Sequence, residues 1–180
     1  MTATAVAATD SPPGAHRRWL LINAVVIPIV LNTVLGGGIA ALGAHGQHLP
    51  LWPQSLITKT GLAVDALGTL FVLPFVTTVS VTLAVRRERQ RGALSQLDAV
   101  DTWSPMIMRL HPQLLRRAAL LGAFFLVVLG PLAIALLDVT ANDGVGWMTF
   151  VWYKVAFCVS FGLVVTPLSA LAAMAEPIAA

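Results

Sequence analysis

Two opposite charges lie inside apolar stretches of the sequence, and they are the first residues whose types and spacing could do chemistry. Asp65 lies near the start of an apolar run that ends at Arg86, and Lys154 lies within a second run that ends before Glu176. At about 1.5 Å per residue, each charge is roughly 31 to 33 Å from the far end of its run, close to the hydrocarbon thickness of a bilayer. Both charges are therefore predicted at one membrane boundary, at equal depth.

An ionisable residue within a membrane span is by default a candidate functional residue. An acid and a base at equal depth on two helices can pair and line the mouth of a cavity. The alternative is that Lys154 extends its amine toward the head groups, while Asp65 interacts with the dipole at its helix N-terminus. Both interpretations are open at this stage. In the first, a polar path for a small solute or ion consists of Asn32, Asp65, Thr69, Lys154 and Thr166.

Other polar residues give weaker indications of chemistry. His45 and His48 are three residues apart, but no acid or cysteine lies nearby to complete a metal site. His111 follows Asp98 and Asp101 at a spacing that matches no catalytic arrangement. The sequence therefore predicts no bound metal, no cofactor and no enzymatic activity.

The composition explains why so few residues are candidates. Hydrophobic residues make up 57% of the chain and charged residues only 11%, which is far from the proportions of a soluble domain. Only a helix closes all its backbone hydrogen bonds within a single apolar segment, so the predicted class is an all-α, polytopic membrane protein. Four spans are expected, each with one proline, at residues 20–42, 61–85, 118–137 and 147–174.

Basic residues predict the orientation of these spans. Nine of the eleven lysines and arginines fall on the side of the termini and the middle connection, whereas Lys59 and Lys154 fall on the other. Cationic loops stay in the cytoplasm, so both termini are expected there. The net charge of +3 is explained by topology, and no nucleic acid partner is expected. The anchors are Arg17, Arg18, Arg86, Arg87, Arg89, Arg91, Arg116 and Arg117.

The spans group into two hairpins of the same orientation. Each hairpin begins with a pair of arginines and has a lysine before or within its second span, which is typical of a parallel internal repeat. Positive-inside anchoring and the thickness of the bilayer would produce much of the same pattern without a duplication. We expect a short interfacial segment between the hairpins. The predicted divisions are a disordered cytoplasmic tail at 1–15, a first hairpin at 16–91, a cytoplasmic connection at 92–115 and a second hairpin at 116–180.

Two spans have features that predict how they pack. Small and polar residues recur every four positions in the first span and would let another helix approach closely: Pro28, Asn32, Gly36 and Ala40. The third span has no polar side chain before Asp138, so it is expected to be the most exposed to lipid.

Three segments carry a resemblance to known proteins. They are LLINAVVIPIVLNTVLGGGIAAL, LFVLPFVTT before the four arginines at positions 86 to 91, and FVWYKVAF with VTPLSALAAM. The chain resembles uncharacterised four-span, tandem-hairpin bacterial inner-membrane proteins described as permease-like. That resemblance implies a fold and a location in the cell envelope, and it implies nothing about a substrate.

Two functions fit these observations. The first is a small permease-like transporter or binding protein for a small solute or ion. The alternative is a non-catalytic accessory or scaffold subunit of a membrane complex. The expected partners are membrane lipids and either further copies of the chain or another membrane subunit, because four helices with small-residue stripes favour contacts between subunits. A hydrated cavity that reaches from Asp65 toward Asn32 would favour the first function, whereas a dry, tightly packed interior with both charges facing head groups would favour the second.

Overall fold

The computed structural model describes residues 18–53, 61–94 and 113–176. It contains four helices that are long and apolar enough to cross a membrane, which confirms the all-α, polytopic class. The predicted tail at 1–15, Arg17 and most of the connection at 92–115 lie outside the described residues. The four helices are the first helix at Leu20–Ala44, α4 at Leu62–Gln90, α6 at Leu114–Ala141 and α7 at Trp147–Ala175.

The first helix changes its winding along its length. Two π-helical stretches flank the turn that contains Pro28, whereas α4, α6 and α7 continue as α-helices through their own prolines. Proline has no backbone N–H to donate, so it disturbs the regular ladder, and π-helical turns are frequent at functional sites. The segments of the first helix are η1 at Leu20–Val26, α2 at Ile27–Leu31, η2 at Asn32–Gly36 and α3 at Gly37–Ala44.

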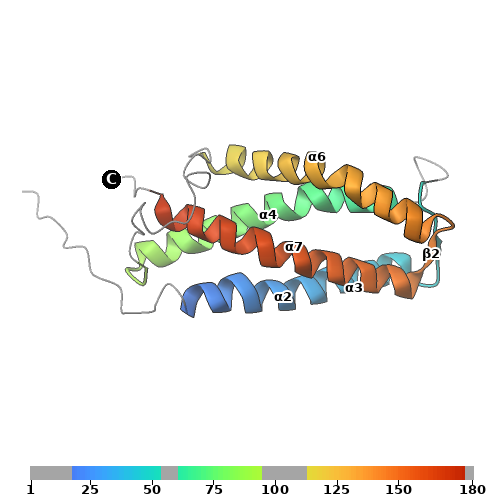
Figure 1. The fold of residues 1–180 in the computed structure, drawn as a ribbon. Coiled ribbons are helices and arrows are strands. Elements are labelled where there is room, and N and C mark those ends of the chain that lie inside the picture. The colour runs from blue at the N-terminus through green and yellow to red at the C-terminus, as the bar shows by residue number, and fades with distance from the viewer. Residues whose placement is uncertain (1–17, 54–60, 95–112, 177–180) are drawn as a thin grey trace, which may run out of the picture.

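Helices α4 and α7 pack against each other at the centre of the bundle (Figure 1). The first helix packs on α7, and α6 packs on α4. The main contacts therefore join helices from different hairpins. At one end, strand β1 (His48–Leu49) pairs antiparallel with β2 (Val145–Gly146) and links the two interhelical turns. This pairing of strands was not predicted from the sequence. We call the end of the bundle where it lies the β-ladder end.

Small residues bring the outer helices close to the central pair. A Cβ atom on Gly37 of the first helix would lie 2.7 Å from Val155 Cγ2 on α7. A Cβ atom on Gly122 of α6 would lie 2.8 Å from the backbone oxygen of Phe71 on α4. Lipid supplies no hydrophobic force between helices, so close backbone approach of this kind is what holds them together. Of the four residues of the expected stripe, Gly36 meets Cys158 of α7, where an added Cβ would lie 3.2 Å from the sulfur, and Pro28 lies against Gly162 of α7.

The prediction that the third span is the most exposed was wrong. In the most apolar 18-residue stretch of each helix, 11% of the residues of the first helix are buried, compared with 22% for α6 and 39% for α7. Helix α6 lies close along α4, because Gly122 meets Phe71 and Gly130 meets Leu67, whereas a pocket separates the first helix from α4.

We expect Gly122→Ala to destabilise the bundle, because the added methyl group would meet the backbone oxygen of Phe71 rather than a side chain that could move. Overpacking of this kind costs about 1 to 3 kcal/mol. Gly68 on α4 has no atom within 4 Å of an added Cβ and is the matched control. Thermal unfolding in detergent measures both variants, and equal stability of Gly122→Ala and Gly68→Ala would contradict the proposed contact.

Candidate functional site

Asp65 and Lys154 form an ion pair between α4 and α7 near the β-ladder end. Lys154 Nζ donates to both carboxylate oxygens of Asp65, at 2.7 Å and 2.6 Å. It also donates to Thr69 Oγ1 at 2.5 Å, and this hydroxyl in turn donates to the backbone oxygen of Asp65 at 2.7 Å. The side chains of Lys154 and Asp65 are 14% and 25% exposed. Of the two interpretations, the structure therefore agrees with the ion pair. It does not agree with two charges that face the head groups separately.

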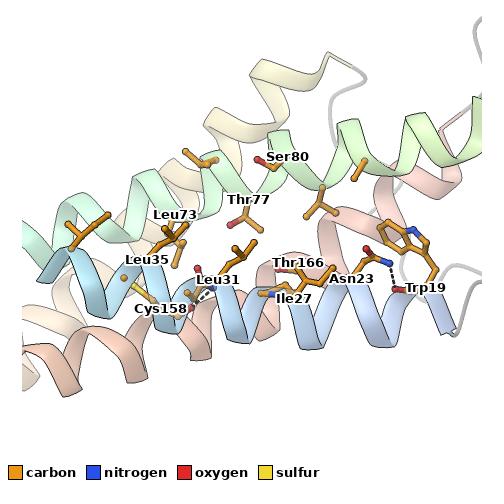
Figure 2. Close-up of a pocket in the computed structure, with 17 residues that line it drawn as sticks. Trp19, Asn23, Ile27, Leu31, Leu35, Leu73, Thr77, Ser80, Cys158 and Thr166 are labelled. Carbon is orange, nitrogen blue, oxygen red and sulfur yellow. Dashed lines mark hydrogen bonds between the residues drawn. The ribbon is translucent and has the colours of Figure 1, made fainter. Parts of the chain in front are cut away.

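A pocket of about 450 Å³ lies elsewhere in the bundle, between the first helix and α4, with α7 contributing Cys158 and Thr166 (Figure 2). Most of its wall is apolar, with Leu31, Leu35 and Leu73 among the lining residues. Its volume falls within the range of small-molecule sites in proteins. None of the described residues that line it is charged. The pocket can therefore hold an uncharged molecule without leaving a protein charge unpaired in a medium of low dielectric constant.

Five polar side chains interrupt the apolar wall of the pocket, and two of them are already used within the protein. Asn23 donates to the backbone oxygen of Trp19 at 3.1 Å, and Asn32 donates to the backbone oxygen of Cys158 at 3.1 Å. Figure 2 shows Thr77 and Ser80 on α4, across the pocket from the first helix. The fifth polar side chain is Thr166 of α7.

Thr166 differs from the other polar residues of the pocket. Its side chain is 0% exposed, and its hydroxyl has no hydrogen-bond partner among the described residues. A buried polar group without a partner costs about 1 to 3 kcal/mol, so the fold retains it at a disadvantage. The hydroxyl is not accessible to a water molecule, so a ligand oxygen or N–H group in the pocket would become its partner after a neighbouring side chain moves aside.

The structure divides the polar path expected from the sequence into two places. Asp65, Thr69 and Lys154 form the ion pair and its hydroxyl partner, whereas Asn32 and Thr166 line the pocket. The first three residues do not line that pocket. A role in a solute path stays a prediction for all five residues.

A second group of charges, which sequence reasoning missed, lies where α4 ends and α6 begins. Arg117 is 2% exposed and donates to Glu176 Oε1 and to Thr82 Oγ1, the latter at 2.8 Å. Arg86 donates to Glu176 Oε2 through Nε at 3.0 Å and Nη2 at 2.8 Å. Arg89, 8% exposed, donates to the backbone oxygens of Ala173 at 3.1 Å and Glu176 at 2.7 Å. We call Arg86, Arg89, Arg117 and Glu176 the arginine cluster.

These arginines were predicted only as topology anchors. Arg18, Arg87, Arg91 and Arg116 are exposed, as anchors at a membrane surface should be, but Arg89 and Arg117 are buried among α4, α6 and α7. The available signal was Glu176, a lone acid at the end of the last apolar run.

The histidines expected to be poor metal ligands have other contacts. The ring of His45 packs against Trp147 at a centroid distance of 5.0 Å, and His48 Nε2 is 2.8 Å from the backbone oxygen of Asp143. Within residues 18–53, 61–94 and 113–176, no group of three or more histidine, cysteine or acidic side chains could hold a metal ion. The candidates His111, Asp98 and Asp101 lie outside the described residues.

Comparisons with known proteins do not assign the chain to a family. No family model matches the chain, and no similar curated protein or solved structure was found. The resemblance to permease-like four-span proteins is therefore not confirmed. The chain is a multi-pass membrane protein by its four apolar helices, and its function has to be argued from the sites themselves.

Removing one partner of the ion pair should destabilise the protein more than removing both partners. In Asp65→Asn, the Lys154 ammonium keeps its charge in a largely buried position without a carboxylate, and loss of one partner of a buried pair costs about 3 to 5 kcal/mol. The double variant Asp65→Asn with Lys154→Gln has no charge to strand and should regain much of the stability. A double-mutant cycle of thermal unfolding measures the coupling. Strictly additive effects would show that the two charges do not interact.

Proposed function

We propose that the protein is a membrane-embedded, non-enzymatic binding protein of permease-like character for a small, uncharged, amphipathic molecule. The observation that carries this proposal is the pocket between the first helix and α4, with the unpaired and fully buried Thr166 hydroxyl in its wall. Apolar walls with a few hydrogen-bonding groups are the usual lining of a small-molecule site.

The exposure of the pocket's walls supports entry from the bilayer. Ile27, Leu31, Leu35, Ile39 and Val76 line the pocket and are 40 to 69% exposed. In a protein that spans a membrane, such apolar surface faces lipid tails. A molecule dissolved in the bilayer can reach the pocket sideways, without crossing a charged surface. The absence of charge among the described lining residues favours a neutral molecule over an ion.

The ion pair gives the proposal its permease-like character. Asp65 and Lys154 connect α4 to α7 near the β-ladder end, and these are two of the helices that line the pocket. A ligand that moved between α4 and α7, from the pocket toward that side of the membrane, would require the pair to open. Without such opening, the protein would bind its ligand and return it to the same bilayer.

The orientation in this proposal rests on the distribution of arginines in the sequence. With the arginine cluster in the cytoplasm, the β-ladder end faces the outside of a bacterial inner membrane. The proposed partners are membrane lipids and further copies of the chain or another membrane subunit. An accessory or scaffold role is the second candidate, and the first helix favours it, because only 11% of its most apolar 18-residue stretch is buried and its free face could receive a partner helix.

A pocket-filling substitution tests the proposed binding. Thr77 is half-buried and lines the pocket, so Thr77→Trp should occupy much of its volume, whereas Thr140→Trp places the same side chain on an exposed position of α6. Small molecules extracted from the purified wild-type protein and both variants are compared by mass spectrometry. We expect at least one neutral compound that co-purifies with the wild type and Thr140→Trp, and that is depleted about tenfold or more in Thr77→Trp.

If the three extracts are the same, the pocket holds no specific ligand. A partner protein that co-purifies equally with the wild type and both tryptophan variants would then count in favour of the scaffold role.

Thr166→Val should change stability and binding in opposite directions. Loss of an unpaired buried hydroxyl should stabilise the ligand-free protein by about 1 kcal/mol or more. The same change removes a hydrogen-bond partner from the ligand, so the co-purifying compound should be depleted about fivefold. Thermal unfolding of delipidated protein and the extraction assay measure the two effects. Destabilisation with full ligand retention would contradict the role given to Thr166.

A further inference from the structure

Among the residues that the structure describes, the arginine cluster contains more positive charge than its one acid, Glu176, can balance. Three guanidinium groups, from Arg86 and Arg89 on α4 and Arg117 on α6, are held around Glu176, the residue that follows α7. Arg86 and Arg117 donate to the Glu176 carboxylate, whereas Arg89 donates to the backbone oxygens of Ala173 and Glu176. Among the described residues, the cluster thus holds three positive charges and one negative charge. An arginine–carboxylate pair normally neutralises itself, so the excess calls for a further anion or for one with more charge than a carboxylate.

The cluster also has hydrogen-bond donors that the protein does not use. Arg89 Nε and Nη2 and Arg117 Nε are buried and have no hydrogen-bond partner among the described residues. Arg89 and Arg117 are themselves more than nine-tenths buried. A buried donor without an acceptor is costly, and more so when it is charged. These donors would be satisfied by an anion with several oxygens.

The depth of the cluster indicates which anions it meets. Helix α4 has 29 residues, so at about 1.5 Å per residue it is roughly 43 Å long, the thickness of a bilayer with its head groups. Arg86 and Arg89 lie in its last turns, and Arg117 lies in the first turn of α6. The cluster is therefore at the level of lipid phosphates. Basic pockets between membrane helices at this depth bind phosphate-bearing head groups.

We propose that Arg86, Arg89 and Arg117 form a binding site for a phosphate group, in which the carboxylate of Glu176 takes the position of the anion in this structure. The unused donors are buried, so a phosphate reaches them by displacing Glu176 from Arg86 and Arg117. Arg86, with its side chain 39% exposed, is the residue that the incoming anion meets first. The phosphate belongs to a lipid head group or to a free phosphate ion. This inference does not depend on the proposed ligand of the pocket.

Calorimetric titration of the purified full-length protein in a neutral detergent tests the site. The probes are dihexanoyl phosphatidylglycerol, inorganic phosphate, and dihexanoylglycerol, which has the same chains and no phosphate. Arg86→Gln and Arg117→Gln remove cluster arginines, and Arg87→Gln and Arg116→Gln remove the same charge at exposed neighbouring positions. Glu176→Gln removes the competing carboxylate.

Saturable binding of phosphatidylglycerol, weakened about tenfold in Arg86→Gln and Arg117→Gln but within about twofold of wild type in the two controls, is the expected result. Glu176→Gln should bind about tenfold more tightly than the wild type, and its melting temperature should rise more on addition of the probe. This gain is measurable even if Arg117→Gln fails to fold.

The probes separate the two sources of phosphate. If inorganic phosphate shows the same ranking of variants at similar concentrations, the site takes free phosphate, and if only the lipid binds, it takes a head group. The proposal is overturned if dihexanoylglycerol binds as tightly as phosphatidylglycerol, if Arg86→Gln and Arg87→Gln bind equally well, or if Glu176→Gln binds less tightly than the wild type.

Discussion

The contact between α4 and α7 is the interaction on which the rest of the structure depends. Polar side chains connect the two helices at three levels. Asp65 pairs with Lys154 near the β-ladder end, and Arg86 pairs with Glu176 at the other end. Between them, in the buried interior, the hydroxyls of Thr78 and Ser169 are 3.0 Å apart. In lipid there is no hydrophobic force to press helices together, so polar contacts and close packing decide which helices pair. The pair of Asp65 and Lys154 is largely shielded from water, so removal of one partner is also costly, which makes the contact at that end specific.

The outer helices follow from this central pair. Each lies against one central helix, the first helix on α7 and α6 on α4, through glycines that allow the backbones to approach. Because the first helix has its main contacts with α7, its side toward α4 is left for the pocket. Buried hydrophobic clusters lie toward both ends of the bundle, one around Leu62 and Phe150 and the other around Val85 and Met174. The pocket borders the second cluster, because Trp19 and Val81 line the pocket and also pack against that cluster.

The two charged sites thus have different chemistry despite their similar role in holding helices. Asp65 and Lys154 balance each other, and Thr69 completes the hydrogen bonds of the ammonium group. The arginine cluster is unbalanced and keeps unused donors. Balanced charges serve well as a closure between helices, whereas unbalanced ones attract an external anion. The pocket has no charge among its described lining residues. It therefore suits a neutral molecule from the bilayer better than a cation or an anion.

The sequence by itself determined the number and placement of the spans, because the bilayer acts on each apolar segment separately and demands a helix of a certain length. It also placed Asp65 and Lys154 at one depth, since depth along a helix follows from counting residues. Which side chains meet was decided only by the tertiary structure. The separation of Asn32 and Thr166 from Asp65, the burial of Arg89 and Arg117, and the pairing of β1 with β2 all depend on rotation and approach of helices distant in sequence. Those are set by the shapes of small residues in contact, which the hydrophobic pattern of a single segment does not contain.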